Sequence, residues 1–298
     1  MKYLIFPGQG SQKPGFLEPW LVNDVFRRQI ESHSEITGLD LAHLGTNASQ
    51  EEISQTSVTQ PLIVSASIAS VRTVFGEDDT SSFDGMAGHS VGEFAAAAIA
   101  GVITDDEAMS LVSQRAQAMQ EAAEQTETGM VAAIGSDIDS LQSKLGGLQI
   151  ANYNGANQYV LAGTKVQLQE IQNNPPEGFR IIPLSVSGAF HSPHMESARK
   201  LLEERFGQVE AKDPIVKLLS NRDGQPVSSG SDYVSALLSQ VSSPVRWDKC
   251  MQQMQGSTDV VEAAPSGVLS NLVKKTIADA NVYSLKSPDQ SIDLADND

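Results

Sequence analysis

The chain has 298 residues, 40% of them hydrophobic, which is enough for one large domain or two unequal ones. A formal net charge of −17 at pH 7 argues against nucleic-acid binding, and the one cysteine, Cys250, excludes an intrachain disulfide and fits a reducing, cytoplasmic setting. No apolar run reaches transmembrane length, and the first one stops at Pro7, so we expect neither a membrane span nor a signal peptide.

The first part of the chain alternates strands and helices. Pro7 to Gln12 form a glycine-containing loop after the first strand, but Lys13 stands where a dinucleotide fingerprint needs its third glycine. Pro61 fits the first turn of a helix, because its missing N–H has no partner there in any case. In chain order we expect a strand over 2–6, a helix over 61–75, a strand end over 84–87, and helices over 91–100 and 105–123.

The middle section has the order β-α-β-β-α-β, which is typical of a ferredoxin-like domain. Its two middle strands are expected to be joined by a turn that contains Asn154 and Gly155. The predicted strands cover 130–134, 148–153, 159–162 and 180–186, and the predicted helices cover 138–145 and 166–171.

The rest of the chain returns to the first pattern. We expect helices over 195–206, 233–241, 247–254 and 268–278, and strands over 215–219, 259–263 and 282–285. The prediction is therefore an α/β fold in which a small domain, 128–187, is inserted between two parts of a large one, 1–127 and 188–285. The last segment, 286–298, is polar and acidic and is predicted to be disordered.

The segment Gly88 to Glu93 reads GHSVGE, which is a G-x-S-x-G nucleophile elbow between a strand and a helix. Such a turn exposes the hydroxyl of Ser90, and the next amide, that of Val91, lies at a helix N-terminus where it can stabilise an oxyanion. The alternative is a glycine-rich turn whose serine has no catalytic role.

A serine nucleophile needs a base, and the chain has five histidines. His89 adjoins Ser90, and neighbouring side chains on an elbow point apart. His191 is a better candidate, because it lies in a loop of small residues between the middle section and a helix. The alternatives are a helix-capping histidine, or a metal site shared with His194 for which no further His or Cys cluster exists.

Arg115 lies on the apolar face of its predicted helix. A guanidinium there is costly unless an anion meets it. Arg115 therefore either binds a substrate carboxylate, or snorkels or pairs with an acidic residue of the protein.

Together these motifs resemble the malonyl-CoA:acyl carrier protein transacylases, both the stand-alone fatty-acid enzymes and the free-standing acyltransferases that serve polyketide synthases. The resemblance covers almost the whole chain in the right order and implies an α/β-hydrolase-like large domain, with a parallel sheet, and an inserted ferredoxin-like small domain. The segments that carry it are FPGQGSQ at 6–12, GHSVGE at 88–93, QRAQAMQ around Arg115, GAFHSPHM at 188–195 and SPVRW at 243–247.

The resemblance also implies a role for each matching residue. Ser90 would be acylated and His191 would be its base, oriented by the main-chain carbonyl of Gln240. The amides of Gln9 and Val91 would form the oxyanion hole. Among substrate-binding residues, Arg115 would hold the malonyl carboxylate, Phe190 would crowd an α-methyl group, and Asn154 would lie near the cleft.

The implied reaction moves a malonyl group from malonyl-CoA to the phosphopantetheine thiol of an acyl carrier protein, without a metal or redox cofactor. An editing hydrolase on the same scaffold is the first alternative, and a non-catalytic scaffold is the second. Arg115 favours malonyl transfer over editing of simple acyl chains. Two stretches depart from the family pattern, at 13–16 and 262–267, and neither includes Ser90 or His191.

Overall fold

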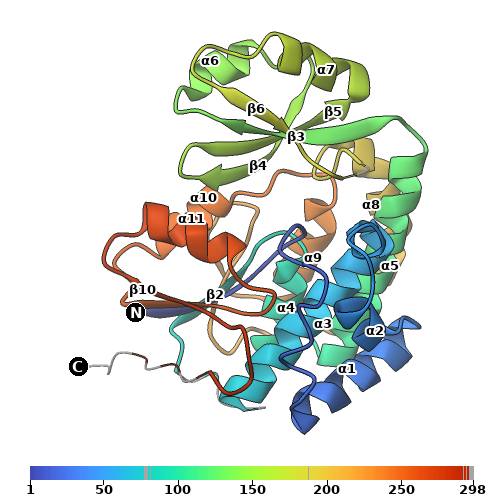
Figure 1. Ribbon diagram of the computed structural model, residues 1–298, viewed down its shortest axis with the longest axis vertical. Helices are drawn as coiled ribbons and strands as arrows, with labels where there is room; N and C mark the ends of the chain where they lie inside the picture. Colours follow the sequence, from blue (N-terminus) through green and yellow to red (C-terminus); the bar gives the residue numbers. More distant parts are fainter. Residues whose placement is uncertain (77–79, 81, 187, 291, 293, 295–298) are drawn as a thin grey trace.

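The computed structural model describes residues 1–76, 80, 82–186, 188–290, 292 and 294, and these form two sheets with helices around them. Figure 1 shows the smaller sheet above the larger one, with the chain passing from the large part to the small part and back. This is the mixed α/β architecture that the sequence predicts.

The larger sheet has six strands in the order β10-β9-β1-β2-β7-β8. All its pairings are parallel except the last, between β7 and β8. The central strands, β1 and β2, are buried throughout, as parallel strands covered on both faces must be. Their bounds are Lys2–Phe6 (β1), Gly85–Gly88 (β2), Lys217–Leu219 (β7), Pro226–Val227 (β8), Asp259–Glu262 (β9) and Asn281–Ser284 (β10).

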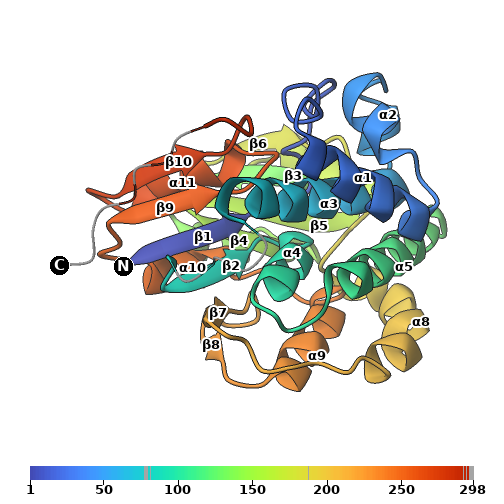
Figure 2. The same cartoon turned by 90° about the horizontal axis from the view of Figure 1, so that it is seen from below.

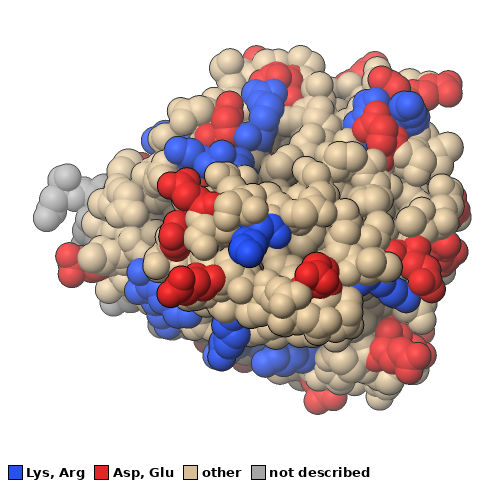
Figure 3. Space-filling model, turned by 90° about the horizontal axis from the view of Figure 1, so that it is seen from above, with Lys and Arg blue, Asp and Glu red and all other residues tan. Residues whose placement is uncertain are grey.

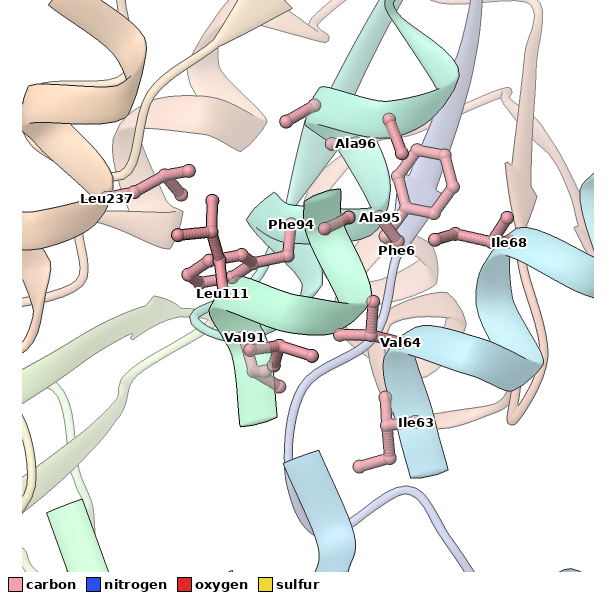
Figure 4. Close-up of a cluster of buried hydrophobic side chains, with 14 of the residues drawn as sticks. Phe6, Ile63, Val64, Ile68, Val91, Phe94, Ala95, Ala96, Leu111 and Leu237 are labelled. Carbon is pink, nitrogen blue, oxygen red and sulfur yellow. The ribbon is translucent and has the colours of Figure 1, made fainter. Parts of the chain in front are cut away.

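Alternate residues of β1 enter different hydrophobic clusters, because successive strand side chains point to opposite faces. Leu4 and Phe6 pack with α3, α4 and α5, whereas Tyr3 and Ile5 pack with α10 and α11. Figure 2 shows these two helix layers and Figure 4 shows the first cluster, in which Phe6 lies near Ala95 and Ile68. The helices of this part are Asp24–Thr37 (α1), Leu41–Thr46 (α2), Thr56–Phe75 (α3), Gly92–Ile99 (α4), Asp105–Glu124 (α5), Glu196–Gly207 (α8), Gly230–Gln240 (α9), Trp247–Gln253 (α10) and Val268–Thr276 (α11), with 3₁₀ turns at Glu52–Ser54 and Pro193–Met195.

Helix α3 is long and apolar enough to cross a membrane, but 72% of its most apolar window is buried inside the protein. Its packing against α1, α4 and α5 accounts for its hydropathy. The helix begins at Thr56, so the prediction that Pro61 opens it was wrong. The first turn is instead capped from another helix, since the amide of Ser57 donates to the side-chain oxygen of Gln120 at 2.9 Å.

The smaller sheet is antiparallel, with the order β4-β5-β3-β6, and α6 and α7 cover one face. The predicted turn was misplaced. Asn154 and Gly155 end β4, and the turn residues are Ala156 and Asn157, whose φ values of 47° and 60° suit a two-residue hairpin turn. The elements are Thr128–Ile134 (β3), Ile138–Ser143 (α6), Gln149–Gly155 (β4), Gln158–Thr164 (β5), Lys165–Asn173 (α7) and Arg180–Pro183 (β6).

The division into domains stays a proposal. It is supported by the larger sheet, which takes strands from before and after the smaller one, and by the separate apolar cluster between the smaller sheet and its helices. The predicted disordered segment, 286–298, lies partly outside the described residues. Within it, the side chain of Gln290 donates to the carbonyl of Ser284 at 2.9 Å.

The turn between β2 and α4 holds Ser90 in the left-handed region, with φ at 53°. The chain crosses itself closely here, because a side-chain carbon on Gly88 would overlap the backbone of Gly92 and one on Gly92 would overlap the carbonyl oxygen of Phe6. The two glycines therefore allow the nucleophile turn to lie directly against the end of β1.

We expect Gly92→Ala to lower the free energy of unfolding by about 1–3 kcal/mol, because the added methyl group forces β1 and α4 apart. Urea denaturation measures this. Gly207→Ala is the matched control, since a carbon added there meets no atom of the described residues within 4 Å, and it should leave the free energy of unfolding unchanged or slightly raised. Equal midpoints for Gly92→Ala and the unmodified protein would contradict this view of the turn.

Candidate active site

A cavity of about 290 Å³ lies between the two sheets. Its floor is the turn after β2, and its roof is the face of the smaller sheet that α6 and α7 leave uncovered, where Met130, Ala132 and Val160 line it. The structure brings most of the predicted site residues to this cavity. Those that line it are Gln9, Ser90, Val91, Arg115, Asn154, Phe190 and His191, and Gln240 lies directly behind them.

Ser90 and His191 form a hydrogen-bonded pair. The main-chain carbonyl of Gln240, at the end of α9, lies 2.7 Å from Nδ1 of His191 and can only accept. Nδ1 therefore carries the proton, and Nε2 accepts from Oγ of Ser90 at 2.7 Å. Ser90, His191 and Gln240 thus supply a nucleophile, a base and an orienting group, and the orienting group is a main-chain carbonyl.

Both members of this pair have unusual backbones, because φ of His191 is 56° and that of Ser90 is 53°. Residues with a side-chain carbon adopt such angles at a cost of about 1–3 kcal/mol, and only where the surroundings hold them. Hydrogen bonds hold Ser90, whose amide donates to the side-chain oxygen of Asn221 at 2.7 Å and whose carbonyl accepts from the side chain of Gln240 at 3.2 Å.

The electrostatics keep His191 neutral. Burial, together with the positive charge of Arg115, lowers its pKa to about 3, and the Gln240 carbonyl opposes this shift. A neutral imidazole is the form that can accept the proton of Ser90 as the hydroxyl attacks.

Gln9 and Val91 line the cavity together with Ser90, and their backbone amides are the candidate oxyanion donors. Within the described part of the chain, neither the amide of Gln9 nor that of Val91 donates a hydrogen bond, so both are free to bind an oxygen atom. The loop of Gln9 is fixed from both sides, since Ser11 Oγ donates to the Gly8 carbonyl at 2.8 Å and the Gln12 side chain donates to Ile53 at 3.1 Å.

Arg115 is only 1% exposed, and no carboxylate lies within ion-pair distance of it among the described residues. Its two terminal nitrogens donate to the side-chain oxygens of Gln60, at 2.5 Å, and Gln240, at 2.9 Å. Among the described residues, its Nε has no hydrogen-bond partner. The guanidinium also lies over the ring of Phe94, with 5.7 Å to the centroid. A cation held by neutral oxygens, with donors to spare and a cavity beside it, is suited to bind an anion.

Asn154 and Phe190 both line the cavity. The side-chain oxygen of Asn154, on β4, lies 2.9 Å from Nε2 of His89, so this pair joins the smaller sheet to the turn of Ser90. The side chain of His89 is thus hydrogen-bonded to Asn154, whereas the hydroxyl of Ser90 is hydrogen-bonded to His191. Phe190 is buried beside His191 and narrows the cavity.

Three residues of the site were not assigned roles from the sequence. Gln60 holds Arg115, Asn221 holds the turn of Ser90, and Glu93 accepts a hydrogen bond from the amide of Asn221 at 2.7 Å. Gln60 and Asn221 lie outside the quoted motifs, and the sequence contains no signal for them. Glu93 is the last residue of GHSVGE, and its place one turn after Ser90 was the available signal.

No group of three or more His, Cys, Asp or Glu side chains in the described part of the chain is arranged to hold a metal ion. His194 in particular lies outside the cavity that His191 lines.

Comparison with known proteins agrees with this geometry. The model of the acyl transferase domain family matches residues 3–291. The malonyl CoA-acyl carrier protein transacylase of Mycobacterium tuberculosis is 40% identical over 301 residues, which cover 98% of each chain.

Solved structures extend the likeness to the fold. The crystal structure of the Mycobacterium tuberculosis protein matches with a TM-score of 0.92 and 41% identity over 97% of both chains. A malonyl-transacylase solved in complex with its type II polyketide synthase acyl-carrier protein matches with a TM-score of 0.88 and 29% identity over 96% of both chains. The predicted two-domain α/β fold is confirmed. The chain belongs to the acyl transferase domain family and, within it, to the malonyl CoA-acyl carrier protein transacylases, as its motifs predict.

Proposed function

We propose that this protein transfers a malonyl group from malonyl-CoA to the phosphopantetheine thiol of an acyl carrier protein. The observation that carries the proposal is the shared cavity, in which the Ser90–His191 pair lies beside a buried guanidinium that has no carboxylate partner among the described residues. Malonyl is a small acyl group with an anionic end, so one end suits the nucleophile and the other suits Arg115. The names of the relatives support the same reaction.

In the first half-reaction, Ser90 Oγ attacks the thioester carbonyl while its proton passes to Nε2 of His191. The amides of Gln9 and Val91 would stabilise the oxyanion. When the carbon–sulfur bond breaks, the imidazolium returns its proton to the leaving CoA thiolate. In the second half-reaction, the carrier thiol gives its proton to His191 and attacks the ester, and Ser90 leaves with that proton.

The acceptor we propose is a carrier protein of fatty-acid or polyketide synthesis. Lys and Arg side chains stand among Asp and Glu on the face seen from above (Figure 3), so this face is mixed in charge rather than uniformly acidic, although the net charge of the chain is −17. We propose a cytoplasmic location, which the single buried thiol of Cys250 supports.

We expect malonyl-CoA to add one malonyl group to Ser90, and the ester to persist in buffer until a phosphopantetheinylated carrier protein discharges it. Intact-mass measurements over time, with and without the carrier, follow both events, and Ser90→Ala should carry no adduct. Loss of the ester at one rate in both samples, with free malonate as product, would identify an editing hydrolase instead.

Arg115→Ala should reduce malonyl transfer by orders of magnitude, since loss of the partner of the substrate carboxylate costs about 2–5 kcal/mol. Acetyl transfer should fall little or rise. Acylation rates with the two CoA esters measure the difference. Gln114→Ala is the control, because Gln114 is on the outer face of the same helix, and it should leave both rates unchanged. Equal loss for both esters would make Arg115 a structural residue.

The lowered pKa of His191 predicts that its base form survives in mild acid. The rate at which phenylmethylsulfonyl fluoride labels Ser90 should stay nearly constant from about pH 7 to pH 5. With an ordinary histidine pKa near 6.5, the labelling rate would fall about 25-fold over this interval. Mass spectrometry of quenched samples gives the rates, and a fall with a midpoint near pH 6.5 would show that His191 is not shielded from water.

A further inference from the structure

Glu93 is buried, at 1% exposed, and has no part in the reaction described above. It lies behind the cavity wall. One carboxylate oxygen accepts from the amide of Asn221 at 2.7 Å, and the other accepts from the side-chain nitrogen of Gln240. Because both oxygens face N–H donors, the surroundings favour the ionised form, and burial opposes it.

The side chain of Gln240 joins Glu93 to Arg115, and its orientation is fixed. Arginine can only donate, so the amide oxygen of Gln240 must face Arg115, where the distance is 2.9 Å. The amide nitrogen then faces acceptors on the other side, including Glu93. Arg115 and the ionised form of Glu93 are thus a buried cation and anion with one neutral amide between them, and the two charges attract each other.

We propose that Glu93 is a specificity-determining residue, the counter-charge of Arg115 relayed through Gln240, and that its negative charge weakens the hold of the site on a malonyl carboxylate. Glu93 and the malonyl carboxylate are two anions near one guanidinium, so each reduces the attraction of Arg115 for the other. An acetyl group carries no carboxylate, so its reaction with Ser90 does not depend on the charge of Glu93. This inference rests on the proposed malonyl transfer.

The charge of Glu93 can be changed by pH without changing its neighbours. The charged and titratable groups that face it are Arg115 from α5, Tyr233 from α9, Cys250 from α10 and Arg222 after β7. Burial raises the pKa of Tyr233 and Cys250 well above their ordinary values, so both stay neutral up to pH 9.

The two arginines stay charged over the same interval. Burial lowers the pKa of Arg115 to about 10, and the hydrogen-bonded Asp232 raises that of Arg222. Burial lowers the pKa of His191 to about 3. Glu93 differs, since burial raises its pKa to about 8, and it therefore gains its charge between pH 6.5 and 9.

The test is the ratio of kcat/KM for Ser90 acylation by malonyl-CoA to that by acetyl-CoA, measured by intact mass from pH 6.5 to 9. If a change in pH alters His191 or the CoA moiety, it changes kcat/KM equally for both esters, so this effect cancels in the ratio. We expect the ratio to fall by about tenfold as Glu93 ionises, as for two unit charges about 10 Å apart in a medium of intermediate dielectric constant.

Glu93→Gln removes the charge at every pH, so its ratio should be flat and should equal the ratio of the unmodified protein at low pH. Glu107→Gln is the matched control. Glu107 lies on α5 eight residues before Arg115, about 12 Å along the helix, and pairs with Arg205, so this variant should keep the full pH dependence.

A flat ratio in the unmodified protein overturns the inference, even if Glu93→Gln does not fold. The same fall in Glu93→Gln as in the unmodified protein also overturns it, because a residue that acts only by holding the turn would not flatten the profile. Failure to form any malonyl ester overturns the proposed function as well, whereas ester formation with a flat ratio overturns this inference alone.

Discussion

One buried positive charge organises this site. Arg115 is surrounded by protein, and its direct partners are the neutral oxygens of Gln60 and Gln240 rather than a carboxylate. A tight ion pair would satisfy the guanidinium and leave little attraction for a substrate. Neutral partners hold its geometry and leave its charge available, and the nearest buried carboxyl group, that of Glu93, lies one amide further away. The side chain of Gln240 also donates a hydrogen bond to the carbonyl of Ser90, so it connects Arg115 to the turn that holds the nucleophile.

The sequence alone predicted the features that depend on residues close together in the chain. Strand β1 and helix α5 follow from apolar patterning, and the elbow at Ser90 follows from two glycines around a serine between a strand and a helix. The loop of small residues favoured His191 among the five histidines, the resemblance assigned it as the base, and the structure places its Nε2 2.7 Å from Oγ of Ser90. The roles assigned to these residues remain proposals that the experiments above address.

Tertiary contacts explain what the sequence could not reveal. Helix α3 begins before Pro61 because a side chain from α5 caps it, and Asn221 supports Ser90 from a point 131 residues further along the chain. Helix α1 is a different case, because the sequence carries its signal and the prediction omitted it. Its buried residues, Phe26, Ile30 and His33, recur at the i, i+4, i+7 spacing of an amphipathic helix. Its N-cap, Asn23, accepts from the amides of Val25 and Phe26 and is a second signal for its start.

The partner of His191 is a main-chain carbonyl, and this has a consequence for how the protein tolerates change. A carboxylate in that position could be lost by a single substitution, but every amino acid brings a carbonyl to position 240. Scanning this chain with alanine would therefore never remove the group that orients the imidazole. Any defect seen at residue 240 would report the amide side chain instead. A substitution at position 240 can therefore change the side chain, which contacts Arg115, while keeping the main-chain carbonyl, which orients His191.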